Sequence, residues 1–130
     1  MITPQLGEAV GVARERKALD LSIMNLEGIS SFTDFFLICS GTSKRHTQAI
    51  CDGILEKLEQ AGTVPTHVEG YSQAEWILMD YLNFVVHIFS ERARRFYDLE
   101  RLWKTAPRVA IPESEAKGRW ESLRLGIPES

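Results

Sequence analysis

The chain has 130 residues, a formal net charge of −3, 44% hydrophobic residues and 25% charged residues. A chain of this length suits one domain and can bury a core without disulfides or metals. The acidic balance argues against a general nucleic-acid-binding protein, because such domains usually carry net positive charge. A local basic patch stays compatible with this balance, because net charge says nothing about distribution.

The cysteines and the hydropathy pattern indicate a reducing compartment. Cys39 and Cys51 lie among apolar residues and form no C-x-x-C pair. We therefore predict two reduced, buried thiols and no zinc site. The first residues lack the basic-then-apolar pattern of a signal peptide, and no apolar run approaches the ~18–20 residues that span a bilayer. We expect a cytoplasmic protein without a membrane partner.

The first half of the chain predicts a helix followed by two strands. Thr3 and Pro4 supply an N-cap and a proline at the first helical position, which predicts a helix from about Pro4 to Lys17. The loosely alternating segment 18–26 is predicted to be a strand. Residues 35–39 are continuously apolar, which is typical of a central strand covered on both faces.

A turn of small residues, Ser40–Ser43, leads from that strand into a second helix. The helix carries Ile50, Ile54 and Leu58 at four-residue spacing and is expected to end at Ala61-Gly62. A strand, a turn and a helix in this order form the first half of a βα unit.

The beginning of this second helix is a candidate anion site. Small residues before a helix can direct backbone N–H groups at an anion, although the spacing of a P-loop is absent. Cations in a first helical turn oppose the helix dipole by ~0.3–1 kcal/mol, which suggests an anionic neighbour. Toleration of exposed cations in screened solvent is an equal alternative. The candidate residues for an anion or RNA contact are Ser43, Lys44, Arg45 and His46.

The second half begins with a hairpin. Residues 64–68, interrupted by Pro65, predict a short strand near a sheet edge. The apolar runs Trp76–Met79 and Phe84–Phe89 are separated by four residues, which predicts an antiparallel pair. Alternation of side chains places two sets on opposite faces of the first strand: Trp76, Leu78 and Asp80 against Ile77, Met79 and Tyr81.

Residues 91–103 show a helical pattern. Phe96, Leu99 and Trp103 share one face of this pattern, and we expect them to pack on the sheet. Asp98 is a candidate cap for a second short helix, which would split the segment. In the proline-interrupted tail, Trp120 and Leu123 allow one more short amphipathic helix.

The residues predict no catalytic site, no metal and no cofactor. A nucleotidyltransferase would need closely spaced carboxylates to hold Mg²⁺, but no D-x-D or D-x-E lies on a predicted strand after the Ser40–Ser43 turn. Asp34, Ser40 and His46 lack the surroundings of a nucleophile elbow. His87 is predicted to be a hydrogen-bonded sheet histidine. The alternative hypothesis is a nucleotide-binding or nucleotidyltransferase-like enzyme that uses the Ser40–Ser43 turn.

Aromatic and arginine residues are concentrated between Trp76 and Trp103. Trp, Tyr and Arg dominate the hot spots of protein interfaces, so this segment is a candidate contact region. Its aromatic and arginine members include Trp76, Tyr81, Phe96, Tyr97, Trp103, Arg94, Arg95 and Arg101.

Several short motifs occur together and in order over roughly the first four-fifths of the chain. They are Thr33-Asp34-Phe35-Phe36, Ser40-Gly41-Thr42-Ser43 with Arg45-His46, Glu69-Gly70, Trp76, Asp80-Tyr81, Val86-His87 and the segment Phe96–Trp103. With these motifs the chain resembles the ribosomal silencing factor family, also called the Iojap family. The resemblance implies an α/β fold, with a mixed sheet flanked by helices, related to nucleotidyltransferases but without their catalytic acids.

The resemblance also implies a function. Members of this family bind the large ribosomal subunit at its protein L-fourteen and sterically block joining of the small subunit, which lowers translation. They tend to form homodimers when free. We expect a silencing-factor domain at residues 1–104 and an extension at residues 105–130, with a possible second contact to ribosomal RNA.

By position in the family, the hairpin turn and the following helical segment are the expected contact region. The expected partner-binding residues are Trp76, Asp80, Tyr81, Leu82, Arg94, Arg95 and Tyr97. One departure from the family lies here: the turn Asp80-Tyr81-Leu82-Asn83 lacks the glycine that members usually carry. We expect Asn83 to adopt the left-handed conformation in its place.

Overall fold

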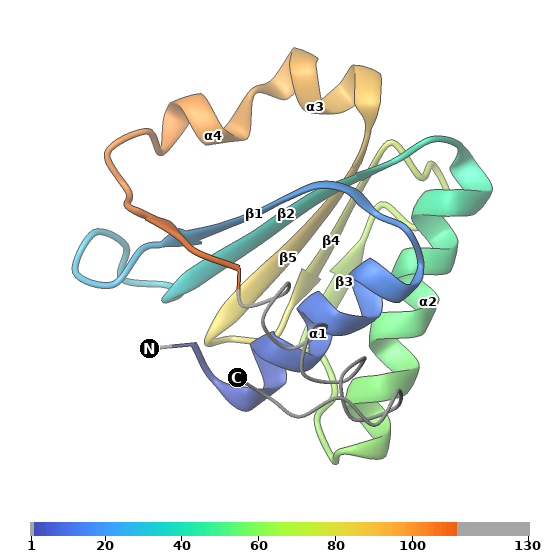
Figure 1. Ribbon diagram of the computed structural model, residues 1–130, viewed down its shortest axis with the longest axis horizontal. Coiled ribbons are helices and arrows are strands. Elements are labelled where there is room, and N and C mark those ends of the chain that lie inside the picture. The colour runs from blue at the N-terminus through green and yellow to red at the C-terminus, as the bar shows by residue number, and fades with distance from the viewer. Residues whose placement is uncertain (1, 112–130) are drawn as a thin grey trace, which may run out of the picture.

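The computed structural model describes residues 2–111 and shows a mixed sheet with helices on both faces (Figure 1). The predicted α/β fold class is confirmed. The predicted tail helix around Trp120 and Leu123 lies outside the described residues. The elements are α1 (Pro4–Glu15), β1 (Leu19–Asn25), β2 (Phe35–Gly41), α2 (Lys44–Gln60), β3 (His67–Glu69), β4 (Trp76–Asp80), β5 (Phe84–Ser90), α3 (Glu91–Tyr97), α4 (Leu99–Leu102) and β6 (Arg108–Val109).

The six strands lie in the order β3-β4-β5-β2-β1-β6. At the centre β2 and β5 pair in parallel, with Phe35 opposite Phe84 and Gly41 opposite Ser90. The other pairings in the described sheet are antiparallel. The predictions of a central strand at residues 35–39 and of a hairpin between β4 and β5 are therefore confirmed, as is the edge position of β3.

Two hydrophobic clusters lie on the two faces of the sheet. The larger one packs α1 and α2 against the sheet through residues such as Leu6, Ile54 and Ile77. The smaller one lies beneath α3 and α4 and includes Phe36 and Phe89. Figure 1 shows α1 and α2 below the sheet and the shorter α3 and α4 above it. Every residue of β2 is buried, as expected for a strand covered on both faces.

The helix ends follow the local sequence. The hydroxyl oxygen of Thr3 accepts a hydrogen bond from the Leu6 N–H at 3.2 Å, which confirms the predicted N-cap of α1. The same helix ends at Glu15, two residues earlier than predicted, because Lys17 adopts a positive φ of 65°. Gly62, with a φ of 84°, follows α2 as predicted. None of the described helices is both long enough and apolar enough to cross a bilayer.

The segment after β5 breaks at Asp98 and changes which side chains are buried. Asp98 has φ 48° and ψ 50° and occupies the N-cap position of α4, which confirms the predicted split and cap position, but its side chain forms no capping hydrogen bond. The left-handed residue rotates α4 relative to α3. Leu99 is buried and Trp103 half-buried, but Phe96 is 78% exposed, so the prediction that it packs on the sheet is wrong.

The sheet also continues beyond the predicted domain boundary at residue 104. Strand β6 pairs with β1, with Val109 opposite Ile23 and Arg108 opposite Met24. The Asn25 N–H donates to the Pro107 carbonyl at 2.8 Å. The first part of the predicted extension therefore belongs to the domain.

Candidate partner-binding surface

The predicted contact residues fall into two groups at opposite ends of β4. Trp76 pairs with Phe89 beside α3, whereas Asp80 pairs with Val85 at the far end of the strand. Four residue steps in a strand span about 13 Å. The structure thus brings Trp76 together with Tyr97, whose ring centroids lie 4.7 Å apart, and separates them from Asp80, Tyr81 and Leu82.

Tyr81 belongs to the core instead of the surface. Its ring stacks on that of Phe84, with 5.0 Å between the centroids. Both side chains are buried in the hydrophobic cluster between the sheet and helices α1 and α2. Burial raises the pKa of Tyr81 to about 12. Alternation along β4 places its ring on the face that carries Ile77 and Met79. Tyr81 therefore presents no exposed ring to a partner, which corrects the expectation that it is a contact residue.

The turn after β4 is exposed and held by short polar contacts. The Asp80 carboxylate accepts from the Leu82 N–H at 2.8 Å, and the Thr33 hydroxyl donates to the Leu82 carbonyl at 2.9 Å. The left-handed residue is Leu82, with φ 72°, so the prediction for Asn83 is wrong. A leucine at positive φ is uncommon, and these contacts stabilise it.

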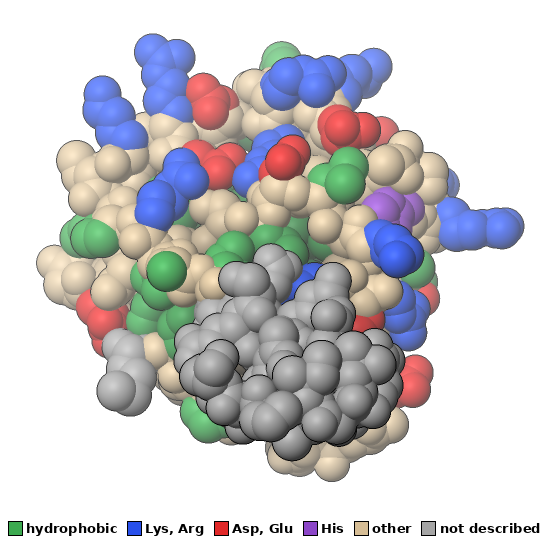
Figure 2. All heavy atoms as spheres, viewed as in Figure 1, with side chains coloured by type: hydrophobic (Ala, Val, Ile, Leu, Met, Phe, Trp, Pro, Cys, Tyr) green, Lys and Arg blue, Asp and Glu red, His purple; other side chains and the backbone are tan. Residues whose placement is uncertain are grey.

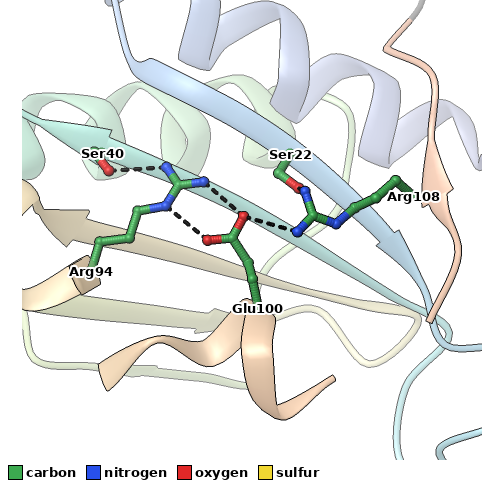
Figure 3. Close-up of polar contacts among 5 residues, drawn as sticks. All are labelled: Ser22, Ser40, Arg94, Glu100 and Arg108. Atoms are coloured by element: carbon green, nitrogen blue, oxygen red, sulfur yellow. Dashed lines mark hydrogen bonds and ion pairs between the residues drawn. The ribbon is translucent and has the colours of Figure 1, made fainter. Parts of the chain in front are cut away.

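Arg94 was expected at the rim of the contact region but is largely buried, with its side chain 14% exposed. Its guanidinium donates to both carboxylate oxygens of Glu100, at 3.1 and 3.0 Å, and to the Ser40 hydroxyl at 3.0 Å (Figure 3). A bidentate pair of this kind is strong and directional. Arg94 therefore ties α3 to α4 and to the central strand β2.

Glu100 extends the same network to the edge of the sheet. Its carboxylate lies 3.6 Å from the guanidinium of Arg108 on β6, and Arg108 donates to the Ser22 hydroxyl on β1 at 3.1 Å (Figure 3). One carboxylate thus holds α3, α4 and β6 in a common arrangement. The sequence alone offered no signal for this pairing, because Arg94 and Glu100 lie on two helices whose relative rotation depends on Asp98.

A row of aromatic rings lies between the sheet and the two short helices. The Trp76 ring packs on the rings of Phe89 and Tyr97, with centroid distances of 4.9 and 4.7 Å. Further along the sheet, the Phe36 ring packs edge-to-face on the rings of His87 and Trp103, with centroid distances of 4.5 and 5.8 Å. These rings support α3 and α4 from below.

His87 lies in this row and is buried. Its Nδ1 accepts a hydrogen bond from the Trp76 indole N–H at 3.1 Å, as the prediction of a hydrogen-bonded sheet histidine requires. Its Nε2 is buried and has no hydrogen-bond partner in the described part of the chain. Burial lowers the pKa of His87 from 6.5 to about 3, so the ring is neutral near pH 7.

The outer side of α3 and α4 combines apolar and cationic side chains. We call it the α3–α4 surface and define it by the exposed residues Arg92, Arg95, Phe96, Tyr97, Arg101, Leu102 and Lys104. Phe96 is 78%, Leu102 75% and Tyr97 47% exposed. Phe96 and Tyr97 line two neighbouring hollows, one bounded by Glu75 and Arg92, the other by residues of α4. Figure 2 shows Lys and Arg side chains gathered over these helices at the top of the molecule.

Phe96 and Leu102 were not among the predicted contact residues. Both are large apolar side chains that remain in contact with water, which is a recognised property of interaction sites. The signal in the sequence was Asp98, because a residue that tolerates the left-handed conformation interrupts the helical period. Arg95 and Tyr97, which were predicted, lie beside them.

The candidate anion site at the start of α2 is occupied by contacts within the chain. The Ser43 hydroxyl accepts from the His46 N–H at 3.0 Å and caps the helix. The Nδ1 of His46 accepts from the Thr42 N–H at 2.9 Å, and its Nε2 lies 2.8 Å from the Arg16 carbonyl. Lys44 and Arg45 are exposed and remain available to an anion.

Residues 2–111 contain no group of three or more His, Cys, Asp or Glu side chains that could hold a metal ion. The Ser40 hydroxyl accepts from Arg94 and lies apart from the contacts of His46, so these residues form no triad with Asp34 in this structure. Cys39 and Cys51 are free and buried, and burial raises the pKa of each to about 12.

The fold and the α3–α4 surface define an α/β protein with an aromatic and basic face suited to a macromolecular partner. The family model described as "Ribosomal silencing factor during starvation" matches residues 2–124. The chain therefore belongs to the ribosomal silencing factor family.

Individual relatives agree with this assignment. The ribosomal silencing factor of Halalkalibacterium halodurans is 40% identical over 103 residues, which are 79% of this chain and 88% of that protein. A crystal structure of a Bacillus halodurans protein superposes with a TM-score of 0.71 at 39% identity and covers 78% of this chain and 92% of that one. A mouse protein named "Mitochondrial assembly of ribosomal large subunit protein 1" is 29% identical over 97 residues, 72% of this chain and 42% of that protein.

Replacing Glu100 by glutamine should destabilise the domain. Glu100→Gln keeps the shape of the side chain but removes the charge that neutralises the largely buried Arg94. We expect the free energy of unfolding in urea to fall by about 1–3 kcal/mol, between the values for surface and buried pairs. The control Glu59→Gln, on the exposed side of α2, should stay within about 0.5 kcal/mol of the parent. Equal effects of the two substitutions would contradict the structural role of the pair.

The stability of the domain should depend on pH through His87. The unfolded chain binds a proton near pH 6.5, whereas the folded state resists protonation of this residue until about pH 3. The contribution of His87 to the free energy of unfolding is therefore complete above pH 6.5. It falls as the pH decreases, by up to about 1.4 kcal/mol per pH unit. In urea unfolding between pH 7 and 5, His87→Phe should show a shallower pH dependence than the parent. Parallel curves for His87→Phe and the parent would contradict the prediction.

Proposed function

We propose that this protein binds the large ribosomal subunit at protein L-fourteen through the α3–α4 surface and blocks joining of the small subunit. The family assignment supports a ribosomal silencing role, and the name of the mouse relative refers to the large subunit. The observation that carries the choice of surface is the exposure of Phe96, Tyr97 and Leu102 among cationic residues. Aromatic and arginine side chains dominate interface hot spots.

The α3–α4 surface is suited to binding because it is already ordered in the free protein. The bidentate pair of Arg94 and Glu100 fixes the two helices against each other, and the Trp76 ring supports Tyr97 from below. Less conformational entropy is lost when a partner meets a surface that is held in place. Trp76 and Arg95 complete the proposed contact beside Tyr97.

Blocking of subunit joining requires only a bound obstacle. A domain of 14.7 kDa that occupies the face of the large subunit excludes the small subunit by its volume, without any reaction. The Ser40–Ser43 turn is consistent with this mechanism. The Ser40 hydroxyl accepts a hydrogen bond from Arg94 and the Ser43 hydroxyl caps α2, so both side chains have partners within the domain. We propose also that the protein acts in the cytoplasm and forms homodimers when free, as the family resemblance implies.

Substituting Tyr97 should weaken association with the large subunit. Tyr97→Ala removes a half-exposed ring from the α3–α4 surface, and we expect binding to weaken by about 1–3 kcal/mol, measured by co-sedimentation with purified large subunits. Tyr71→Ala is the matched control, because Tyr71 is an exposed tyrosine on the loop beside α2. If the parent protein does not co-migrate with the large subunit, the proposed function is wrong. If both variants bind like the parent, the binding surface lies elsewhere.

We propose a second, weaker contact between the start of α2 and ribosomal RNA. Lys44 and Arg45 are exposed in the first turn of α2, where the helix dipole adds positive potential. The double variant Lys44→Glu with Arg45→Glu should make the salt dependence of large-subunit binding shallower, its slope falling by about one for each phosphate that the protein no longer neutralises. Lys57→Glu, in the last turn of the same helix, should leave the slope unchanged. An unaltered slope in the double variant would exclude the RNA contact.

A further inference from the structure

We propose that His87 is a positioning residue: its Nδ1 fixes the Trp76 indole and thereby the orientation of Tyr97 on the α3–α4 surface. The consequence for ribosome binding rests on the proposed function. The orientation of the two rings is a property of the free protein and can be measured without a ribosome.

A continuous set of contacts leads from the middle of the sheet to the surface. His87 lies on the central strand β5 with its ring edge-to-face against Phe36, 4.5 Å between centroids. The Trp76 indole N–H donates to His87 Nδ1 at 3.1 Å. The Trp76 ring in turn lies 4.7 Å from Tyr97, which is 47% exposed. The buried Nδ1 of His87 is thus linked to Tyr97, which is proposed to meet the partner, through a single residue, Trp76.

Packing alone does not explain a histidine at this position. Because Nδ1 accepts the indole hydrogen, the neutral ring carries its own hydrogen on Nε2. That N–H is buried and lacks a hydrogen-bond partner in the described part of the chain. An unpaired buried donor lowers stability, and a phenylalanine would fill a similar volume without one. The property that histidine adds is the acceptor for Trp76.

The two rings need this acceptor because packing between tilted rings does not by itself fix their orientation. The Trp76 ring packs on Phe89 and Tyr97 at centroid distances of 4.9 and 4.7 Å, tilted by 32° and 47°. Ring contacts of this kind occur over a range of offsets and angles, so they leave the position of the indole nitrogen open. A hydrogen bond to the indole nitrogen selects one orientation. Tyr97 is the last residue of α3 and precedes the left-handed Asp98, so the following backbone does not continue the helix that carries it.

The test compares His87→Phe with His87→Asn in the full-length protein. Phenylalanine removes the acceptor, whereas the asparagine side-chain oxygen stands close to where Nδ1 was and can restore it. By NMR of the free protein, His87→Phe should shift the Trp76 indole N–H resonance upfield and alter the Tyr97 ring resonances. Its affinity for the large subunit should fall about twofold to tenfold, the range for loss of one hydrogen bond. His87→Asn should recover most of both signals.

Two further variants separate positioning from stability. Val86→Ala removes buried methyl groups from the adjacent position of β5, on the face beneath α1 and α2, and should lower stability without moving the Tyr97 resonances. In a Trp76→Phe background the indole donor is absent, so His87→Phe should cause no additional loss of affinity. The Trp76→Phe variant thus tests the same hydrogen bond by removing its donor instead of its acceptor.

Three results would overturn the proposal. The first is a Tyr97 spectrum in His87→Phe that matches the parent. The second is an affinity loss in His87→Phe no larger than that of Val86→Ala. The third is an undiminished effect of His87→Phe in the Trp76→Phe background. If the parent protein itself fails to bind the large subunit, the proposed function is wrong, and the Tyr97 resonances alone decide whether His87 positions the ring.

Discussion

The parallel pairing of β2 with β5 is the constraint on which the rest of the structure depends. Both strands are buried almost throughout, so the sheet needs cover on each face. On one face two long helices, α1 and α2, provide it. On the other face the cover consists of the short helices α3 and α4, supplemented by the aromatic row and the pair of Arg94 with Glu100. The layer proposed to meet the partner is therefore the same layer that seals half of the core.

This double role explains the composition of the α3–α4 surface. A single long helix would turn Phe96, Leu99 and Trp103 toward the sheet together, whereas the left-handed Asp98 allows Leu99 and Trp103 to cover the core while Phe96 faces water. The interruption removes helical hydrogen bonds, and the polar network around Arg94 offsets that loss. Binding and folding are coupled here, because any movement of α4 that exposed Leu99 would also displace the residues proposed to meet the partner.

The sequence was sufficient where the pattern is local. The buried strand at residues 35–39, the hairpin, the cap at Thr3, and the opposite faces of Trp76 and Ile77 follow from periodicity and helix-end preferences. The sequence did not predict contacts between residues far apart in the chain, or side-chain burial that depends on a single backbone angle. Arg94 meets Ser40 across 54 positions, and the exposure of Phe96 depends on the φ of Asp98. For the candidate site, Tyr97 and Arg95 were predicted from residue type and position in the family, and both are exposed, whereas burial assigned Tyr81 to the core.

The two edges of the sheet give the molecule a further property. Among residues 2–111, the outermost strands of the sheet are short, three residues in β3 and two in β6, so each of these strands offers few unpaired backbone groups to another chain. Short edges of this kind oppose extension of the sheet into a neighbouring molecule, which is the usual first step of strand-mediated aggregation. A protein with an exposed apolar face at α3 and α4 gains from this arrangement, because side-chain recognition on that face does not compete with indiscriminate pairing of backbones along the edges.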